Sequence, residues 1–439
     1  MEKSLQGAAA AQSHRYLNVA FLGEHASGKS TVAGHLLKLL KSSLTVQSDK
    51  ITKKPLYASL FDTLSEERSL GMTINFHQAY AQTANTHFQF TDCPGYPKYF
   101  KNLLRGLQGA QVAVFVLDVN GACFEECRDQ LTDQLTACYH GQVDNLVVCV
   151  NRMDHREVQW ERTQYDEIVS EFRLVAYKIG YKEDQIKAII PISGTQGDNL
   201  MIKSDRMKWY EGPTLIKVLE QVKVNYPEEL KQKPFMMIVK SIHRVPCAET
   251  IVAGVVLQGS VWKDMEVFIN STRCISTSVK SIQAHCKSIA EASVGMSVGL
   301  QLKNLQAYEI NVGDVVKQQA EPIVVKSKIK ITASIVINRN VFTKSGLFKW
   351  QKINGHFHLG QATFKIEKLI NKEGVEVAQI VPAAVQQGDI ITCQLSFVQS
   401  CPSFQGTTAT ENPQLGKFIL RDYGELIGVG VINEILNSK

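Results

Sequence analysis

The sequence predicts an α/β domain with a mostly parallel sheet, followed by two β-barrel domains. Three observations support this fold class. The chain has 439 residues, which is too long for a single core. Continuous apolar runs alternate with amphipathic segments in the first half, and short strand-like runs separated by glycine turns fill the second half.

The first half contains five apolar runs that predict buried strands. They are continuous rather than alternating, which is typical of a parallel sheet covered by helices on both faces. These runs cover residues 17–23, 87–92, 113–119, 145–151 and 188–193. Segments of helical period lie between them, and a last one follows at residues 212–222. We therefore expect one domain over residues 17–226, preceded by a flexible tail over residues 1–16.

The second half changes character after residue 226. A charged, proline-flanked stretch over residues 227–235 is typical of a linker. Short strands and glycine turns then predict β-barrel domain two over residues 235–319. A second break near residue 320 precedes further short strands, which predict β-barrel domain three over residues 322–439.

Composition excludes several classes of protein. The chain has 44% hydrophobic and 21% charged residues, as ordinary globular proteins do. Its ten cysteines include no CxxC pair, which argues against a zinc site or a disulfide framework. No stretch reaches the ~20 apolar residues of a membrane span. We expect a cytoplasmic protein without membrane association. The formal charge of +6 is compatible with RNA but predicts little by itself, because Lys and Arg are scattered along the chain.

A phosphate-binding loop follows the first predicted strand. The run GEHASGKS fits G-x-x-x-x-G-K-[ST] and lies between a strand and a helix, where its N–H groups and the helix N-terminus favour phosphate. Lys29 would reach the β and γ phosphates, and the Ser30 hydroxyl would bind Mg²⁺. The candidate nucleotide-binding residues here are Gly23, Glu24, His25, Ala26, Ser27, Gly28, Lys29, Ser30 and Thr31.

Two later motifs predict guanine specificity. NRMD, which contains Asn151, Arg152 and Asp154, follows the fourth apolar run. An aspartate there can accept hydrogen bonds from guanine N1–H and N2, and the planar Arg152 cation can stack on the base. The SGT run of Ser193, Gly194 and Thr195 would complete the base pocket through backbone N–H groups.

A third group of residues predicts a magnesium site. Asp92 and Gly95 belong to DCPG, which follows the second apolar run, and Thr73 precedes it in GMT. Asp92 would hold Mg²⁺ through water, and the Gly95 amide would contact the γ-phosphate. Ser30, Thr73 and Asp92 are therefore the candidate metal residues, and GTP, GDP and Mg²⁺ the expected ligands.

In their order along the chain, which is the phosphate loop, GMT, DCPG, NRMD and SGT, the five motifs resemble the translational GTPases of the elongation factor 1-alpha type, including the release-factor and ribosome-rescue paralogues. Further matching text includes EERSLGMTI, DCPGYPKYFKNLLRG, IIPISGTQGDNL and NPQLGKFILRDYGELIGVGVINEI. The resemblance implies a P-loop GTPase domain followed by two β-barrels. It also implies a GTP-to-GDP switch that works with the ribosome and with tRNA or a tRNA-shaped factor.

The chain departs from the family pattern at positions tied to hydrolysis. The family phosphate loop reads G-H-V-D-[AS]-G-K-[ST], so His25 replaces a gate valine and Ala26 an aspartate. Tyr96 stands where D-x-P-G-H has the histidine that positions the attacking water. The candidate catalytic residues are thus a degenerate Tyr96, His25 as a relocated imidazole, and Thr73. Residues 344–360 replace the A-G-Y-x-P-V-L-x-x-H-T stretch, which helps the elongation branch to bind tRNA.

Three functions remain open from the sequence. The first is a Mg²⁺-dependent GTP/GDP switch acting in translation, with slow hydrolysis. The second is a nucleotide-locked scaffold with little or no GTPase activity, for example one associated with a cytoskeletal filament. The third is an adenine-nucleotide enzyme that shares only the architecture, which NRMD and SGT disfavour.

Overall fold

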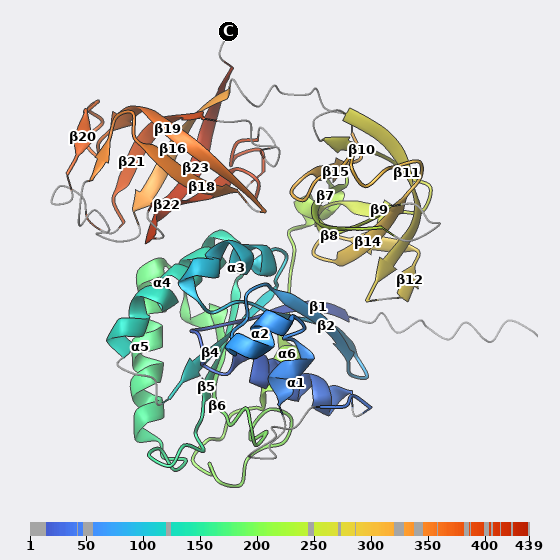
Figure 1. The fold of residues 1–439 in the computed structure, drawn as a ribbon, viewed down its shortest axis with the longest axis vertical. Helices are drawn as coiled ribbons and strands as arrows, with labels where there is room; N and C mark the ends of the chain where they lie inside the picture. Colours follow the sequence, from blue (N-terminus) through green and yellow to red (C-terminus); the bar gives the residue numbers. More distant parts are fainter. Residues whose placement is uncertain are drawn as a thin grey trace, which may run out of the picture.

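The computed structural model describes residues 15–41, 43–46, 56–119, 124–244, 250–270, 274–285, 287–319, 329–337, 346–357, 359–381, 386, 388–398, 404, 407–412, 414–422 and 425–437. Figure 1 shows three bodies in chain order: an α/β domain in blue to green, a β-barrel in yellow and a second one in orange to red. The predicted fold class is confirmed.

The α/β domain is built on a six-stranded sheet in the order β2-β3-β1-β4-β5-β6. Its strands are β1 (Arg15–Leu22), β2 (His77–Gln82), β3 (Thr86–Asp92), β4 (Val112–Asp118), β5 (Asn145–Asn151) and β6 (Ile186–Pro191). Only the edge strand β2 runs antiparallel to its neighbour within this sheet of described residues. β5 is buried at every residue, which explains its continuous apolar sequence. β1 begins at Arg15, two residues before the predicted start.

Helices cover both faces of this sheet. They are α1 (Lys29–Leu40), α2 (Ser65–Leu70), α3 (Phe100–Leu107), α4 (Phe124–His140), α5 (Thr163–Ile179) and α6 (Leu215–Gln221), with the short 3-10 turns η1 (Tyr57–Leu60), η2 (Pro97–Tyr99) and η3 (Glu183–Gln185). Figure 1 shows α4 and α5 on one side of the sheet and α1 on the other. In the parts of the chain that the structure describes, no helix has the length and apolarity that crossing a membrane requires.

The first barrel follows a short helix, α7 (Glu228–Gln232), that lies within the predicted linker. Its strands are β7 (Met236–His243), β8 (Ile251–Gln258), β9 (Ser260–Trp262), β10 (Glu266–Asn270), β11 (Cys274–Ala284), β12 (Lys287–Ile289), β13 (Glu291–Ser293), β14 (Ser297–Leu302) and β15 (Val315–Lys317). The order β10-β15-β7-β8-β14-β11 closes through pairing of β10 with β11. We call this body barrel two.

The last body, barrel three, closes in the order β16-β21-β19-β18-β22-β23. Its strands are β16 (Ile329–Ile337), β17 (Leu347–Phe348), β18 (Lys352–Phe357), β19 (Gly360–Ile370), β20 (Gln379–Ile380), β21 (Ile390–Phe397), β22 (Lys417–Asp422) and β23 (Glu425–Asn437). Its interior packs around Phe357, Phe364 and Phe418, with centroids of adjacent rings 5.1–5.5 Å apart.

The three bodies contact one another. Asn18 of β1 donates from Nδ2 to the Gly295 carbonyl of barrel two at 3.1 Å. The Arg421 guanidinium of barrel three lies 4.4 Å from the ring centroid of Phe100 at the start of α3. The carboxyl ends of the parallel strands meet at one edge of the α/β sheet, and the loops with the phosphate-binding, DCPG, NRMD and SGT motifs follow them there. The segment with Thr73 precedes the antiparallel β2, whose first residue pairs with the last residue of β3 at the same edge.

Candidate functional site

The loop over residues 23–30 follows β1 and continues into α1, as the sequence predicts. Gly23 and Gly28 have φ angles of 134° and 92°, which only glycine adopts readily. A Cβ on Gly23 would collide with the Val116 carbonyl, and one on Gly28 with the Asn151 side chain. Both glycines are therefore required by the close approach of neighbouring strands and side chains to this loop.

A glutamine of α4 fixes the start of the loop. The Gly23 N–H donates to Gln134 Oε1 at 2.8 Å, and Gln134 Nε2 donates back to the Gly23 carbonyl at 3.0 Å. Gln134 is 1% exposed, so this pair satisfies backbone groups that water cannot reach. Sequence reasoning missed Gln134, because nothing in an amphipathic helix marks which polar residue turns inward.

Lys29 is held inside the loop. Its side chain is 5% exposed, and its ammonium donates to the Glu24 carbonyl. Burial lowers the pKa of Lys29, while the charges of Asp92 and Glu24 act in the opposite direction. Gly95 packs directly on this ammonium, since a Cβ there would collide with it. The structure thus brings the DCPG segment onto the phosphate loop and concentrates a buried positive charge between them.

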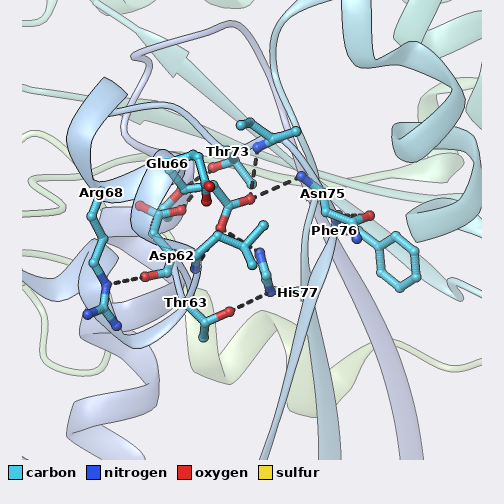
Figure 2. Close-up of polar contacts among 12 residues, drawn as sticks. Asp62, Thr63, Glu66, Arg68, Thr73, Asn75, Phe76 and His77 are labelled. Atoms are coloured by element: carbon cyan, nitrogen blue, oxygen red, sulfur yellow. Dashed lines mark hydrogen bonds and ion pairs between the residues drawn. The ribbon is translucent and has the colours of Figure 1, made fainter. Parts of the chain in front are cut away.

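The three predicted metal residues meet beside Lys29. Ser30 Oγ lies 3.1 Å from Thr73 Oγ1, which donates to Asp62 Oδ1 at 3.2 Å (Figure 2). Asp92 is fully buried, and neither of its carboxylate oxygens has a hydrogen-bond partner of good geometry among the described residues. Burial raises the pKa of Asp92 to about 7, against the opposing effects of Lys29 and Ser30. Two hydroxyls and an orphaned carboxylate are oxygen donors suited to Mg²⁺.

Asp62 is a member of this cluster that sequence reasoning missed. It is 9% exposed, and burial raises its pKa although its bond to Thr73 lowers it. No motif spacing links Asp62 to Ser30 or Thr73. Only the fold of the chain from η1 through α2 brings it there.

The segment after α2 holds Thr73 in place. Glu67 is fully buried and accepts hydrogen bonds from the amides of Ile74 at 2.9 Å and Asn75 at 3.0 Å. His77 Nε2 lies 2.8 Å from the same carboxylate, and Figure 2 shows Asn75 and His77 turned toward this centre. Burial alone would raise the pKa of Glu67, but these hydrogen bonds outweigh it and hold the pKa below its usual range.

Asn151 connects the predicted base pocket to the phosphate loop. Its Nδ2 donates to the Ser27 carbonyl at 2.9 Å, and its Oδ1 accepts from the Gly194 N–H at 2.8 Å. Thr195 Oγ1 donates to Asp154 Oδ2 at 3.2 Å. The structure therefore brings the NRMD and SGT residues together at the carboxyl ends of β5 and β6.

Arg152 makes contacts that the sequence did not suggest. Its guanidinium pairs with Asp118 Oδ2 at 2.6 Å and donates to the Ala26 carbonyl at 2.7 Å. These bonds hold the cation at the rim between the phosphate loop and β5. Its predicted role of stacking on a base stays a prediction.

His25 of the phosphate loop and Tyr96, which follows the DCPG segment, face each other. Their ring centroids lie 5.9 Å apart, with the planes at 87° in an edge-to-face arrangement. Both residues are exposed, Tyr96 to 45%. The two residues that depart from the family pattern, His25 and Tyr96, are therefore in contact with each other.

Comparison with known proteins decides the family. The family model of the elongation factor Tu GTP binding domain matches residues 14–252, more than half of the chain. The chain belongs to this family. A second model, the GTP-eEF1A C-terminal domain-like family, matches residues 330–433 of this family member. As such a member, the chain is a guanine-nucleotide-binding protein similar to translation factors.

Relatives cover nearly all of this family member. It is 27% identical to elongation factor 1-alpha of Hyperthermus butylicus over 98% of both chains. It is 29% identical to elongation factor 1-alpha 1 of Euplotes crassus over 96% of both. Among solved structures, the Ski7 GTPase-like domain of S. cerevisiae bound to GDP and inorganic phosphate shares the fold, with a TM-score of 0.70 at 18% identity over 96% of this chain and 98% of that one.

Replacing Asp154 with Asn is expected to weaken GTP and GDP binding about 10- to 100-fold and to favour xanthine nucleotides. The carboxylate that would accept from guanine N1–H and N2 is lost, and such charge-assisted bonds contribute about 1.5–3 kcal/mol. Calorimetry with GDP, XDP and ADP measures the change. Asp166→Asn on the exposed face of α5 is the matched control. Equal affinity of the unmodified chain for ATP and GTP would refute the base-pocket assignment.

Lys29→Ala is expected to lower GTP and GDP affinity by at least 10- to 100-fold, because it removes a buried charge-assisted contact of about 1.5–3 kcal/mol. The nucleotide retained by the purified variant, separated by ion-exchange chromatography, reports the loss. Lys38→Ala in the same helix should keep its nucleotide. Unchanged occupancy in Lys29→Ala contradicts the assignment of the phosphate loop.

Proposed function

We propose that this chain is a Mg²⁺-dependent GTP/GDP switch that acts in translation and hydrolyses GTP slowly. The family membership supports guanine-nucleotide binding, and the similarity to elongation factors along the whole chain supports a role in translation. The contact between His25 and Tyr96 carries the proposal of slow hydrolysis.

Mg²⁺ fits the oxygens that gather beside Lys29. Ser30 and Thr73 would bind it, and Asp92 would hold it through water. When bound, the ion would supply positive charge that offsets the negative charge developing on the phosphates during transfer. Asp62 lies against Thr73 and would orient its hydroxyl. Two acidic side chains, buried near one another, also lower the cost of placing a divalent cation between them.

Lys29 and the loop amides supply the electrostatic part of catalysis. The ammonium is already enclosed by Glu24 and Gly95, so little reorganisation is needed when a triphosphate enters. The Gln130 side chain also donates to the Gly95 carbonyl, which holds the DCPG segment beside the phosphate loop. These features support retained nucleotide binding.

The remaining requirement is a group that positions the attacking water. In the resembling family this is a histidine after D-x-P-G, and here the residue is Tyr96. A phenol donates a hydrogen bond to water at neutral pH but accepts a proton poorly. The Tyr96 ring also packs edge-on against His25, and this contact holds the Tyr96 side chain in its exposed position. The His25 imidazole is the second candidate for the positioning role.

A nucleotide-locked scaffold is the alternative function, and the same contact favours it. If neither ring positions water, the GTP-bound arrangement would persist and serve as a binding surface. A cytoskeletal filament would then be the partner of a single conformation, whereas the ribosome and tRNA or a tRNA-shaped factor are the expected partners of the translation switch. Co-sedimentation with ribosomes in the presence of a non-hydrolysable GTP analogue distinguishes the two functions, because only the translation switch should sediment.

Single-turnover GTP hydrolysis tests the proposal. The unmodified chain should hydrolyse GTP about 10²–10⁴-fold more slowly than Tyr96→His, the usual contribution of a positioned acid–base group. His25→Val restores the family gate residue and should leave the slow rate unchanged.

Tyr177→His is the matched control, because this tyrosine of α5 is 44% exposed and distant from the loop in sequence. Equal rates for the unmodified chain and Tyr96→His would contradict impaired hydrolysis. A loss of activity confined to His25→Val would show instead that His25 has taken over the positioning role.

Poor delivery of aminoacyl-tRNA is the second expectation. Within the stretch 344–360, the described residues 346–357 form β17 and β18 rather than the family's tRNA-binding sequence, and residues 344, 345 and 358 lie outside the described part. Filter binding of charged tRNA with a GTP analogue should show no retention above that of uncharged tRNA. Tight, GTP-dependent binding of aminoacyl-tRNA would contradict this expectation and support an ordinary role in elongation.

A further inference from the structure

A lysine of barrel two is buried against the α/β domain. Lys240 lies in β7 and is 6% exposed. Its ammonium donates to the carbonyls of Gly106 at 3.3 Å and Gln108 at 3.0 Å. These carbonyls belong to the C-terminal end of α3, where the helix dipole favours a positive charge. Barrel two thus caps the helix that follows the DCPG segment.

The same ammonium touches the segment that carries Thr73. It lies 5.1 Å from the ring centroid of Phe76, three residues after Thr73. The Arg105 guanidinium of α3 lies 5.6 Å from the same ring. Phe76 is therefore a platform for two cations, one from each domain, and such contacts strengthen when they are removed from water.

The two segments that meet at Lys240 are packed tightly on each other. A Cβ on Gly106 would lie 2.6 Å from Cys93 Sγ and 3.0 Å from Phe76 Cβ. A shift of either segment by a fraction of an ångström must therefore displace the other. The turn after α3 also fits into barrel two, because a Cβ on Gly109 would lie 2.8 Å from Val255 Cγ1.

Holding this cation in the interface is costly. Burial lowers the pKa of Lys240 to about 8, with Arg105 acting in the same direction and Cys93 against it. Among the ion pairs of the described residues, none joins Lys240 to a carboxylate. The contacts of the ammonium with two carbonyls and one ring must offset the free-energy cost of removing it from water. They stabilise the interface only while α3 and Phe76 keep this arrangement.

We propose that Lys240 is a positioning residue that couples barrel two to the two segments that contact the γ-phosphate side of the site. This coupling rests on the proposed GTP/GDP switch. Thr73 lies 3.1 Å from Ser30 in this structure, the arrangement that a triphosphate and its cation would hold. Lys240 therefore favours the triphosphate-bound arrangement, and a displacement of Gly95 or Thr73 would break its contacts and release barrel two.

The test uses Lys240→Met in the full chain, because methionine keeps an apolar stem and removes the charge. We expect the ratio of affinities for a non-hydrolysable GTP analogue over GDP to fall about fivefold or more, the lower range of allosteric coupling. Amide hydrogen exchange provides a second readout. In the unmodified chain, residues 103–109 and 236–243 should exchange more slowly with the analogue than with GDP, and the variant should lose this difference.

Lys263→Met, a solvent-exposed lysine of barrel two, is the matched control and should behave as the unmodified chain does. If Lys240→Met does not fold, Phe76→Leu carries the test, with an expected fall in the ratio of about twofold or more. An unchanged ratio and an unchanged exchange difference in the variant would overturn the coupling alone. An unmodified chain that binds no guanine nucleotide would refute the proposed function as well.

Discussion

The amide of Asn151 is the contact on which the geometry of the site depends. One side chain at the end of β5 bonds both the Ser27 carbonyl and the Gly194 N–H, and it is 3% exposed. Losing it would leave two buried backbone groups unsatisfied, at a cost of about 1–3 kcal/mol each. It also explains Gly28, since a larger residue would collide with this amide. The phosphate loop and the base pocket are thus fixed relative to each other before any nucleotide binds.

The phosphate loop and the segments packed against it enclose ionisable groups whose burial the protein alone compensates only in part. Lys29 is buried, and so are Asp62 and Asp92, whose pKa values are raised by desolvation. Such an arrangement costs stability in the free protein and becomes favourable when a ligand supplies both a polyanion and a cation. Nucleotide binding should therefore stabilise the folded state by mass action. The free energy of unfolding of the α/β domain should then increase with the occupancy of the site.

The sequence predicted the parts of the site that are local in the chain. Lys29 and Ser30 lie in one short run whose spacing the phosphate contact dictates, and their order relative to Asn151 predicted a base pocket whose residues the structure brings together. It did not predict Gln134 or Asp62, because their positions come from the packing of α4 and of the segment between η1 and α2. A polar residue on a helix or before a turn has no pattern that marks it as buried. The fold class followed from strand and helix periodicity, whereas the helix within the predicted linker did not.

The residues proposed for water positioning and those proposed for domain coupling lie in different surroundings. Tyr96 and His25 are exposed, and changes at exposed positions usually alter stability by no more than about 0.5 kcal/mol. Lys240 and Phe76 lie in a packed interface, where a change disturbs the fold as well as the function. The proposed water-positioning residues can therefore vary with little effect on folding, while the contacts that join barrel two to α3 are constrained by packing. If the proposed function holds, a chain of this kind can hydrolyse GTP slowly and still keep the proposed conformational response to nucleotide.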